Sequence, residues 1–224
     1  MIVLALETST RQISVALWQD GAVLQRAADS QTGGSMLVLP WVDELLAEAG
    51  IAKSAVGGIA FGAGPGSFTG LRLACGVAQG LAFGLGIPAF GVTTLAALAL
   101  ASGEARVFAC MDARMNEVYA AAYEVTGRDV KELEPPRVAP PEMVALPAGE
   151  WIGCGDGFAS YAARLPIPAR VRPDVFPTAA AVAELAAPRL ARGEGVDAAH
   201  AMPLYVRDKV ALTTAERLAR GGVR

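Results

Sequence analysis

The sequence predicts an α/β protein of two lobes that share a duplicated strand pattern. Each half opens with an apolar, strand-like run that ends in an acidic turn, residues 2–6 before Glu7 and residues 106–111 before Asp112. A second strand-like segment, a glycine-containing turn and a third segment then follow in both halves. We therefore predict an amino-terminal lobe at residues 1–102 and a carboxyl-terminal lobe at residues 103–224, each with parallel strands and helices after the repeated unit.

The first half contains strong local signals. Strands are expected at residues 2–6, 13–18 and 22–28, with an Asp20-Gly21 hairpin turn between the last two. Residues 36–49 read as an amphipathic helix that Gly50 ends. Its inward positions are expected to be Leu39, Val42, Leu45, Leu46 and Ala49. The rest of the lobe is expected to begin with a strand at residues 57–61, a glycine turn and a glycine-rich helix to Gly86. A short strand then follows residues 88–91, and the last helix of the lobe is capped by Thr93 or Thr94 and ends at Ser102.

The second half is less regular. Strands are expected at residues 117–125, 130–133 and 151–154, and an extended segment at residues 201–206. Proline pairs at 135–136 and 140–141 predict irregular chain, and residues 166–177 read as a loop. Residues 178–192 are alanine-rich and helical, with Thr178 as cap and a kink or break at Pro188.

Composition and charge limit the function classes. The 224 residues are 53% apolar and 18% charged, which indicates a globular protein, and the net charge of −3 gives no overall attraction for nucleic acid. Basic residues nevertheless gather in a terminal tail. They are Arg207, Lys209, Arg217, Arg220 and Arg224, set against Asp208 and Glu216. This tail is either a solvated helix or a patch near an anionic partner.

Cysteine spacing and the opening residues favour the cytoplasm. Cys75, Cys110 and Cys154 are far apart and form no CxxC pair, so neither a disulfide framework nor a zinc site is indicated. The opening MIVLALETS lacks the basic start and cleavage site of a signal peptide. The longest uncharged run, after Arg72, is interrupted by glycines, Gln79 and Pro88, so we expect no membrane span.

The glycine turn GAGPGSFTGLR, residues 62–72, has two interpretations. Ser67 follows Gly66 where a Walker loop needs lysine, and the dinucleotide pattern GxGxxG also fails. Free N–H groups at the helix start could still hold an anion or nucleotide, with contacts from Gly64, Gly66, Ser67, Thr69 and Arg72. The alternative is a tight turn in which Ser67 or Thr69 caps the helix.

The helix after this turn predicts association. Gly76, Gly80 and Gly84 are spaced by four residues, although each glycine costs a helix roughly 1 kcal/mol relative to alanine. Ala74, Ala78 and Ala82 form a second row of small residues. One row suffices for packing within the fold, so a subunit interface is favoured over internal packing alone. The predicted interface is Leu73, Gly76, Val77, Gly80, Leu81 and Gly84, with Trp41 and Leu45 from the preceding helix.

Residues suited to catalysis are scarce. The only histidine is His200, so a metal centre built on two histidines is excluded, and a Ser-His-Asp peptidase would require His200 to fold beside a nucleophile. Asp112 and Arg114 at a strand end could bind a ligand or pair with each other. We predict no catalytic residue and no metal site.

Several segments together resemble one family. They are GPGSFTGLR at residues 64–72, the opening ALETST, Leu39-Pro40 before the rest of the first helix, Asp112-Ala113-Arg114 followed by Glu117-Val118-Tyr119, and PLYVR at residues 203–207. All five resemble segments of the TsaB (YeaZ) family. These segments span nearly the whole chain, and the nine-residue signature is specific.

The resemblance implies both a fold and a role. The fold would be the two-lobed actin/Hsp70/sugar-kinase-like fold of duplicated ribonuclease-H-like units. The role would be that of a non-catalytic scaffold or activator in synthesis of threonylcarbamoyladenosine, the modified adenosine beside the tRNA anticodon. Expected partners are a TsaD-type catalytic subunit, which binds metal through HxxxH, and a TsaE-type ATPase. ATP is expected at those subunits and no cofactor here. Members associate through helices of the amino-terminal lobe, as a homodimer when alone, and meet tRNA only through the complex.

Two departures from the family pattern matter. Members usually carry aspartate where this chain has Glu7, and often His-Ser where it has Gly34-Ser35. Glu7 also occupies the place where ATPases of this fold carry an acidic residue for the magnesium-bound nucleotide. The alternative hypothesis is therefore an independent nucleotide-dependent phosphotransferase that uses Glu7, the glycine turn and Asp112.

Overall fold

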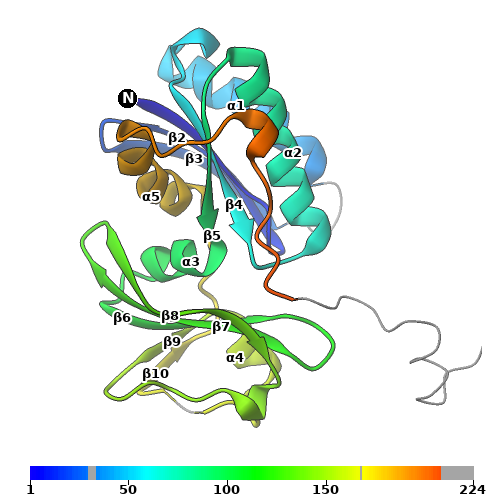
Figure 1. The fold of residues 1–224 in the computed structure, drawn as a ribbon, viewed down its shortest axis with the longest axis vertical. Coiled ribbons are helices and arrows are strands. Elements are labelled where there is room, and N and C mark those ends of the chain that lie inside the picture. Colours follow the sequence, from blue (N-terminus) through cyan, green and yellow to red (C-terminus); the bar gives the residue numbers. More distant parts are fainter. Residues whose placement is uncertain (30–33, 167, 208–224) are drawn as a thin grey trace, which may run out of the picture.

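The computed structural model describes residues 1–29, 34–166 and 168–207, and its first sheet has five strands (Figure 1). Its strands are β1 (Ile2–Glu7), β2 (Gln12–Gln19), β3 (Ala22–Asp29), β4 (Gly58–Gly64) and β5 (Ala89–Thr93), in the order β3-β2-β1-β4-β5. β1, β2 and β3 are antiparallel neighbours, whereas β4 and β5 run parallel to β1. The predicted hairpin is confirmed, with Asp20 and Gly21 both at positive φ, 50° and 97°.

The second sheet repeats this order. Its strands are β6 (Arg106–Asp112), β7 (Val118–Thr126), β8 (Asp129–Ala139), β9 (Ile152–Cys154) and β10 (Arg170–Arg172), in the order β8-β7-β6-β9-β10. β6, β7 and β8 are again antiparallel, and β9 and β10 again run parallel to β6. The duplication is confirmed and extends from three strands to five. The chain therefore has the predicted two-lobed actin/Hsp70/sugar-kinase-like fold.

Helices α1 (Ser35–Ala49) and α2 (Phe68–Leu85) cover one face of the first sheet. On α1, Val42, Leu45 and Leu46 are buried as predicted, but Leu39 is 53% exposed and Val38 points inward instead. The prediction for Leu39 was wrong by one position, because the four-residue spacing back from Val42 along the helix leads to Val38. Gly50 ends α1 in the left-handed conformation, as predicted.

The opposite face of the first sheet is covered by a helix from the far end of the chain. α5 (Ala179–Ala191) packs its alanines and Val182 on β1, β2 and β4. Thr178 caps it by accepting a hydrogen bond from the Ala181 N–H at 3.2 Å, as predicted, and the helix continues three residues past Pro188 rather than breaking there. α5 therefore packs on the first lobe, whereas it was predicted to lie with the rest of residues 103–224 in the second lobe.

α3 (Thr94–Ser102) lies between the two lobes. Thr93 is its cap residue, although its side chain makes no capping hydrogen bond. Leu95, Leu98 and Ala99 pack on the second sheet, while α5 contacts α3 from the other side. The far face of the second sheet is covered by Trp151 and by Phe158 of the short helix α4 (Gly157–Ser160). Short 3-10 turns occur at η1 (Lys53–Ala55), η2 (Pro141–Met143) and η3 (Ala198–His200).

Two predictions for the second lobe were wrong. β8 runs through Pro135 and Pro136, which were expected in irregular chain; it is an edge strand, where a missing N–H is tolerated, and its register shifts nearby. Residues 166–177, expected as a loop, contain the edge strand β10. The basic tail after Arg207 lies outside the described residues.

After η3 the chain forms a segment, residues 201–207, that we call the terminal strap. It runs along α2 toward the second lobe (Figure 1). The Ala201 carbonyl accepts a hydrogen bond from Gln79 Nε2 at 2.8 Å, and the Leu204 N–H donates to the Ala63 carbonyl at 2.7 Å. The strap, like α5, is thus a late part of the chain that packs on the first lobe.

Candidate functional site

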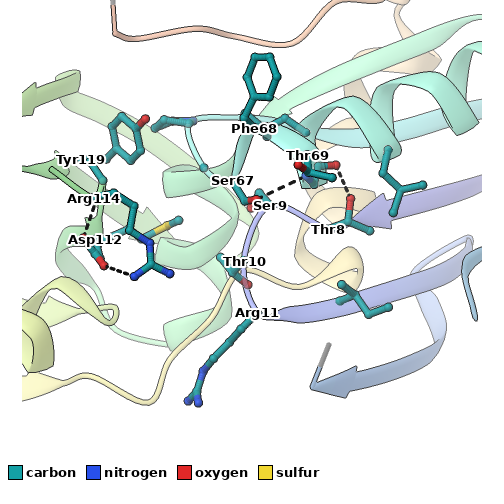
Figure 2. A pocket seen from close by; sticks show the side chains of 18 of the residues that line it. Thr8, Ser9, Thr10, Arg11, Ser67, Phe68, Thr69, Asp112, Arg114 and Tyr119 are labelled. Carbon is teal, nitrogen blue, oxygen red and sulfur yellow. Dashed lines mark hydrogen bonds and ion pairs between the residues drawn. The ribbon is translucent and has the colours of Figure 1, made fainter. Parts of the chain in front are cut away.

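A cleft of about 630 Å³ opens between the lobes. It is lined by the β1–β2 turn, the β4–α2 turn, the β6–β7 turn, Asp156 and the terminal strap. Figure 2 shows the hydroxyl side chains of the β1–β2 turn between the start of α2 and the Asp112–Arg114 pair. Gly34 and Ser35, where the resembled family often has His-Ser, also line it.

The glycines of the signature let the β1–β2 turn approach α2 closely. Thr8 Oγ1 donates to the Gly70 carbonyl at 2.7 Å, and the Ser67 N–H donates to the Ser9 carbonyl at 2.7 Å. A Cβ on Gly70 would overlap the Thr8 carbonyl oxygen, and one on Gly66 would lie 2.7 Å from Ser9 Cβ. Glycine is therefore required at both positions for packing.

The capping interpretation of the glycine turn has direct support. Ser67 is the cap of α2, and its Oγ accepts from the Gly70 N–H at 3.5 Å, while Thr69 lies within the first helical turn. Ser67, Thr69 and Gly66 line the cleft, as does Ser9, whose buried Oγ has no hydrogen-bond partner among the described residues. Anion binding at this turn stays a prediction.

Two residues proposed for the anion contact lie elsewhere. Gly64, at φ +126°, faces the strap: a Cβ there would lie 2.6 Å from the Leu204 carbonyl oxygen. Arg72 is outside the cleft-lining set; its guanidinium lies 4.0 Å from the Phe68 ring centre and its Nε donates to Tyr205 Oη at 3.5 Å. Gly64, at the end of β4, and Arg72, on α2, both lie against the strap.

Glu7 is fully buried and is not among the described residues that line the cleft. Its Oε1 accepts from the Ser9 N–H at 2.7 Å, whereas Oε2 has no partner in the described part of the chain. A Cβ on Gly62 would overlap this carboxylate, so glycine is required beside it. Burial raises the pKa of Glu7, because it disfavours the charged form. The carboxylate is therefore closed off from a ligand in the cleft.

Asp112 and Arg114 pair with each other, which was one of the two alternatives. Arg114 Nη1 lies 3.0 Å from Asp112 Oδ2, and Tyr161 Oη donates to Asp112 Oδ1 at 3.1 Å. The turn that holds them has three consecutive left-handed residues, Arg114, Met115 and Asn116, at φ 60°, 56° and 61°. A left-handed backbone costs free energy in residues other than glycine. It is tolerated here because hydrogen bonds to Asp112 and to the Ala113 carbonyl hold the turn in place.

Sequence reasoning missed Asp156 as a cleft residue. Its Oδ1 accepts from the Asp112 N–H at 3.0 Å, and burial raises its pKa. The duplicated strand order could have indicated this residue. Gly155-Asp156-Gly157 follows β9 as the glycine turn follows β4, and both turns reach the same cleft. His200, in contrast, lies in η3 at the surface, outside the described cleft lining.

The strap closes the cleft from one side. Arg207 forms an ion pair of 2.5 Å with Glu117, and its Nη2 donates to the Ala113 carbonyl at 3.0 Å. Together with the Leu204 bond to Ala63, these contacts tie the end of β4 to the β6–β7 turn. No sequence signal indicated that PLYVR would bridge the lobes.

The outer face of α2 is the second candidate site. Gly76, Gly80 and Gly84 are exposed, and a Cβ on any of them would meet nothing within 4 Å. Ala74, Ala78 and Ala82 are buried against the sheet, so the two small-residue rows have opposite roles.

The other predicted interface residues differ in exposure. Leu73, Val77, Leu81 and Trp41 are partly buried against the core, with an edge left open. Leu45 is fully buried, so its prediction as a contact residue is corrected: its place on α1 faces the sheet. α2 has the length and mean hydropathy, 1.3 over 18 residues, of a membrane-crossing helix, but its alanine row packs in the fold.

Comparison with known proteins decides the family. The chain is 35% identical over 224 residues to the Escherichia coli tRNA threonylcarbamoyladenosine biosynthesis protein TsaB, covering 94% of this chain and 96% of that one. The chain belongs to the TsaB (YeaZ) family. The Haemophilus influenzae TsaB is 45% identical over 123 residues, about half of each chain (53% and 52%).

Structural comparison agrees with the TsaB family. The solved structure described as YeaZ from Pseudomonas aeruginosa superposes with a TM-score of 0.86 at 44% identity, covering 91% of this chain and 99% of that one. Residues 34–152 also match the family model described as TsaD, tRNA N6-adenosine threonylcarbamoyltransferase. A Nitratidesulfovibrio vulgaris protein of that name is 33% identical over 119 residues, 46% of this chain and 33% of that one.

Proposed function

We propose that the protein is a non-catalytic scaffold or activator subunit in tRNA threonylcarbamoyladenosine synthesis, and that it binds a TsaD-type catalytic subunit through the outer face of α2. The observation that carries this proposal is the open glycine row, Gly76, Gly80 and Gly84. Glycine lowers helix stability, and no atom of the described fold occupies the space that these residues leave. A second helix can approach such a row closely.

The shared family model supports a TsaD-type partner. Residues 34–152, which match that model, include both α1 and α2. Two chains with the same lobe can pair these helices around an approximate two-fold axis, as identical subunits do in a symmetric dimer. The same face would then support a homodimer when the protein is alone.

The residue inventory favours a non-catalytic role. His200 is the one histidine in the chain, so the HxxxH metal pair expected of a TsaD-type subunit cannot form here. The described residues contain no cluster of three or more potential metal ligands. We assign ATP use to the catalytic and TsaE-type partner subunits, contact with tRNA to the complex, and the working location to the cytoplasm.

The test of the interface is Gly80→Arg. We expect this variant to remain folded, because nothing occupies the space beside Gly80, but to lose self-association and binding of the TsaD-type subunit. Ala163→Arg, an equal charge change on an exposed position of the second lobe, is the matched control. Size-exclusion chromatography with light scattering measures both variants, alone and with the partner. A folded Gly80→Arg protein that still pairs would contradict the proposal.

The biological role requires a separate measurement. Depletion of the protein should remove threonylcarbamoyladenosine from cellular tRNA, as measured by mass spectrometry of digested nucleosides. The variant Gly80→Arg should fail to restore it, whereas Ala163→Arg should. Unchanged levels of the modified nucleoside after depletion would contradict the role.

An independent phosphotransferase is the alternative. The observation in its favour is the interlobe cleft, which is lined in part by Ser9, whose hydroxyl has no hydrogen-bond partner among the described residues. Titration calorimetry of the isolated protein with magnesium and ATP separates the two functions. Tight binding with turnover would favour the phosphotransferase, and absence of turnover is the result expected for a scaffold.

A further inference from the structure

Three aromatic and three arginine side chains lie where the terminal strap borders the cleft. Five of them line the cleft, and the sixth, Arg72, adjoins it through Phe68 and Tyr205. The aromatic residues are Phe68, Tyr119 and Tyr205, and the arginines are Arg72, Arg114 and Arg207. They come from α2, β7, the β6–β7 turn and the strap. We call these six residues the rim cluster; Phe68, Tyr119 and Arg114 are labelled in Figure 2.

Two arginines of the rim cluster lie over aromatic rings, and two of its rings are neighbours with tilted planes. The Phe68 and Tyr205 ring centres lie 6.2 Å apart with their planes tilted by 34°. The Arg72 guanidinium lies 4.0 Å from the Phe68 ring centre, and the Arg207 guanidinium lies 6.0 Å from that of Tyr119. Phe68 is nevertheless 48% exposed and Tyr205 49% exposed, so each keeps part of its surface open to a ligand.

Arg72 is the arginine of the rim cluster that has no ion-pair partner among the described residues. Arg114 is paired with Asp112 and Arg207 with Glu117, whereas the described residues place no carboxylate within ion-pair distance of Arg72. Its polar contact is with the Tyr205 hydroxyl, at 3.5 Å. A guanidinium held flat against an aromatic ring can still donate hydrogen bonds at its edge to a phosphate.

Packing within the fold does not account for the exposure of Phe68 and Tyr205. Large aromatic residues that pack in the lobes, such as Trp151 and Phe61, are about 1% exposed, in contrast to Phe68 and Tyr205. Nor does the cluster resemble the proposed partner face, where the glycine row of α2 carries no charge. Exposed rings interleaved with arginines are the pattern by which proteins bind unpaired nucleotides, because every base has a face that can stack.

We propose that the rim cluster binds single-stranded RNA directly, with a base stacked on Phe68 and Tyr205 and a backbone phosphate held by Arg72. The relatives' role in tRNA modification makes a tRNA loop a suitable source of unpaired nucleotides. This inference goes beyond the proposed function, in which tRNA is met only through the complex. It needs no TsaD-type partner and can be tested on the isolated protein.

The test is fluorescence anisotropy of a labelled single-stranded RNA oligonucleotide, titrated with the full-length protein over a salt series. Phe68→Ala should weaken binding about fivefold to 150-fold, the range found when a stacking aromatic is replaced by alanine. Arg72→Gln should also weaken it, and should reduce the slope of log affinity against log salt by about 0.7, the value for one lost single-strand phosphate contact. Phe68→Ala should leave that slope unchanged.

Phe83→Ala is the matched control, because Phe83 is an 82% exposed aromatic on the same helix, away from the rim cluster. It should bind RNA as the wild-type protein does. Annealing the probe to its complement should weaken binding, since paired bases cannot stack on the rings. Circular dichroism verifies that each variant is folded.

Three results would overturn the inference. The first is no RNA binding by the wild-type protein even at low salt, and the second is equal affinity of Phe68→Ala, Arg72→Gln and wild type. The third is loss of the TsaD-type partner, but not of RNA, in the Phe68→Ala variant, which would assign the cluster to a protein contact. Failure of Gly80→Arg to disrupt pairing would contradict the proposed function and leave this inference standing.

Discussion

At the scale of single residues, six of the eight glycines of residues 62–86 divide into two groups with different causes. Gly62, Gly66 and Gly70 are required because atoms of Glu7, Ser9 and Thr8 occupy the space of a side chain. Gly76, Gly80 and Gly84 face open space instead. The sequence shows both groups as the same residue type, so only the structure separates the glycines that pack from those available to a partner.

This division predicts opposite effects of alanine. Gly76→Ala should raise the free energy of unfolding by up to about 1 kcal/mol, because alanine favours the helix and meets no neighbour. Gly70→Ala should lower it, since its Cβ would overlap the Thr8 carbonyl oxygen. Urea denaturation measures both variants. A Gly70→Ala protein as stable as Gly76→Ala would contradict the packing role.

Glu7 predicts a particular pH dependence of stability. Its folded-state pKa is raised above the ordinary value of 4.5, so the folded protein binds more protons than the unfolded chain between 4.5 and the folded pKa. The contribution of Glu7 to stability is therefore fully present below 4.5 and is lost as pH rises through the folded pKa. Glu7→Gln should remove this decline and be at least as stable as wild type at neutral pH.

Denaturation across a pH series that spans 4.5 and neutrality tests this prediction for Glu7. Glu150→Gln, the same substitution at an exposed position, is the control for the loss of one carboxyl group. A Glu7→Gln variant that is much less stable than wild type at neutral pH would indicate that the charged carboxylate is needed.

At the scale of elements, the outcome of prediction depended on whether the signal was local. Asp20-Gly21, the Thr178 cap and the apolar runs of β1, β4 and β6 act over a few residues, and each was predicted correctly. α5 was assigned to the wrong lobe because the sheet that it covers comes from the distant amino-terminal part of the chain, and β10 was missed because a three-residue edge strand is defined only by its pairing with β9. The candidate site followed the same rule: the turns after β1, β4 and β6 were found, but the turn after β9 and the bridging contacts of the strap were not.

The strap gives a prediction for one side chain. Arg207→Gln should cost about 1–3 kcal/mol, because Arg207 is only 13% exposed and its loss leaves the Ala113 carbonyl and Glu117 without their partner. Arg114→Gln, at an 87% exposed side chain in the same turn, should cost under about 1 kcal/mol. Hydrogen exchange should speed up in the β6–β7 turn for the first variant. Equal exchange in both variants would contradict the bridging role.

At the scale of the whole molecule, the amino-terminal lobe is built from two separate parts of the chain. Residues 1–102 provide its sheet, but α5 buries Val3, Ala5, Ala16 and Ala60 on one face of that sheet. The strap then packs along α2 on the other face. The two lobes therefore share one strand topology, but the first lobe is not made from one continuous stretch of the chain.

A fragment of residues 1–102 should consequently fail to fold. Without α5, one face of its sheet would remain apolar and exposed, a condition that favours aggregation. Adding α5 back through a flexible linker after Ser102 should restore a soluble, cooperatively unfolding protein. Gel filtration and thermal denaturation compare the two proteins. A stable monomeric fragment of residues 1–102 would contradict the structural role of α5.

The late position of α5 also sets the order of events during translation. The strands of the first sheet leave the ribosome long before residues 179–191 do. At about 5–20 residues per second, their apolar face stays bare for roughly 5 to 20 seconds after β5 emerges. The second lobe is synthesised during this interval, so the nascent first sheet is a natural substrate for chaperones until the last helix arrives.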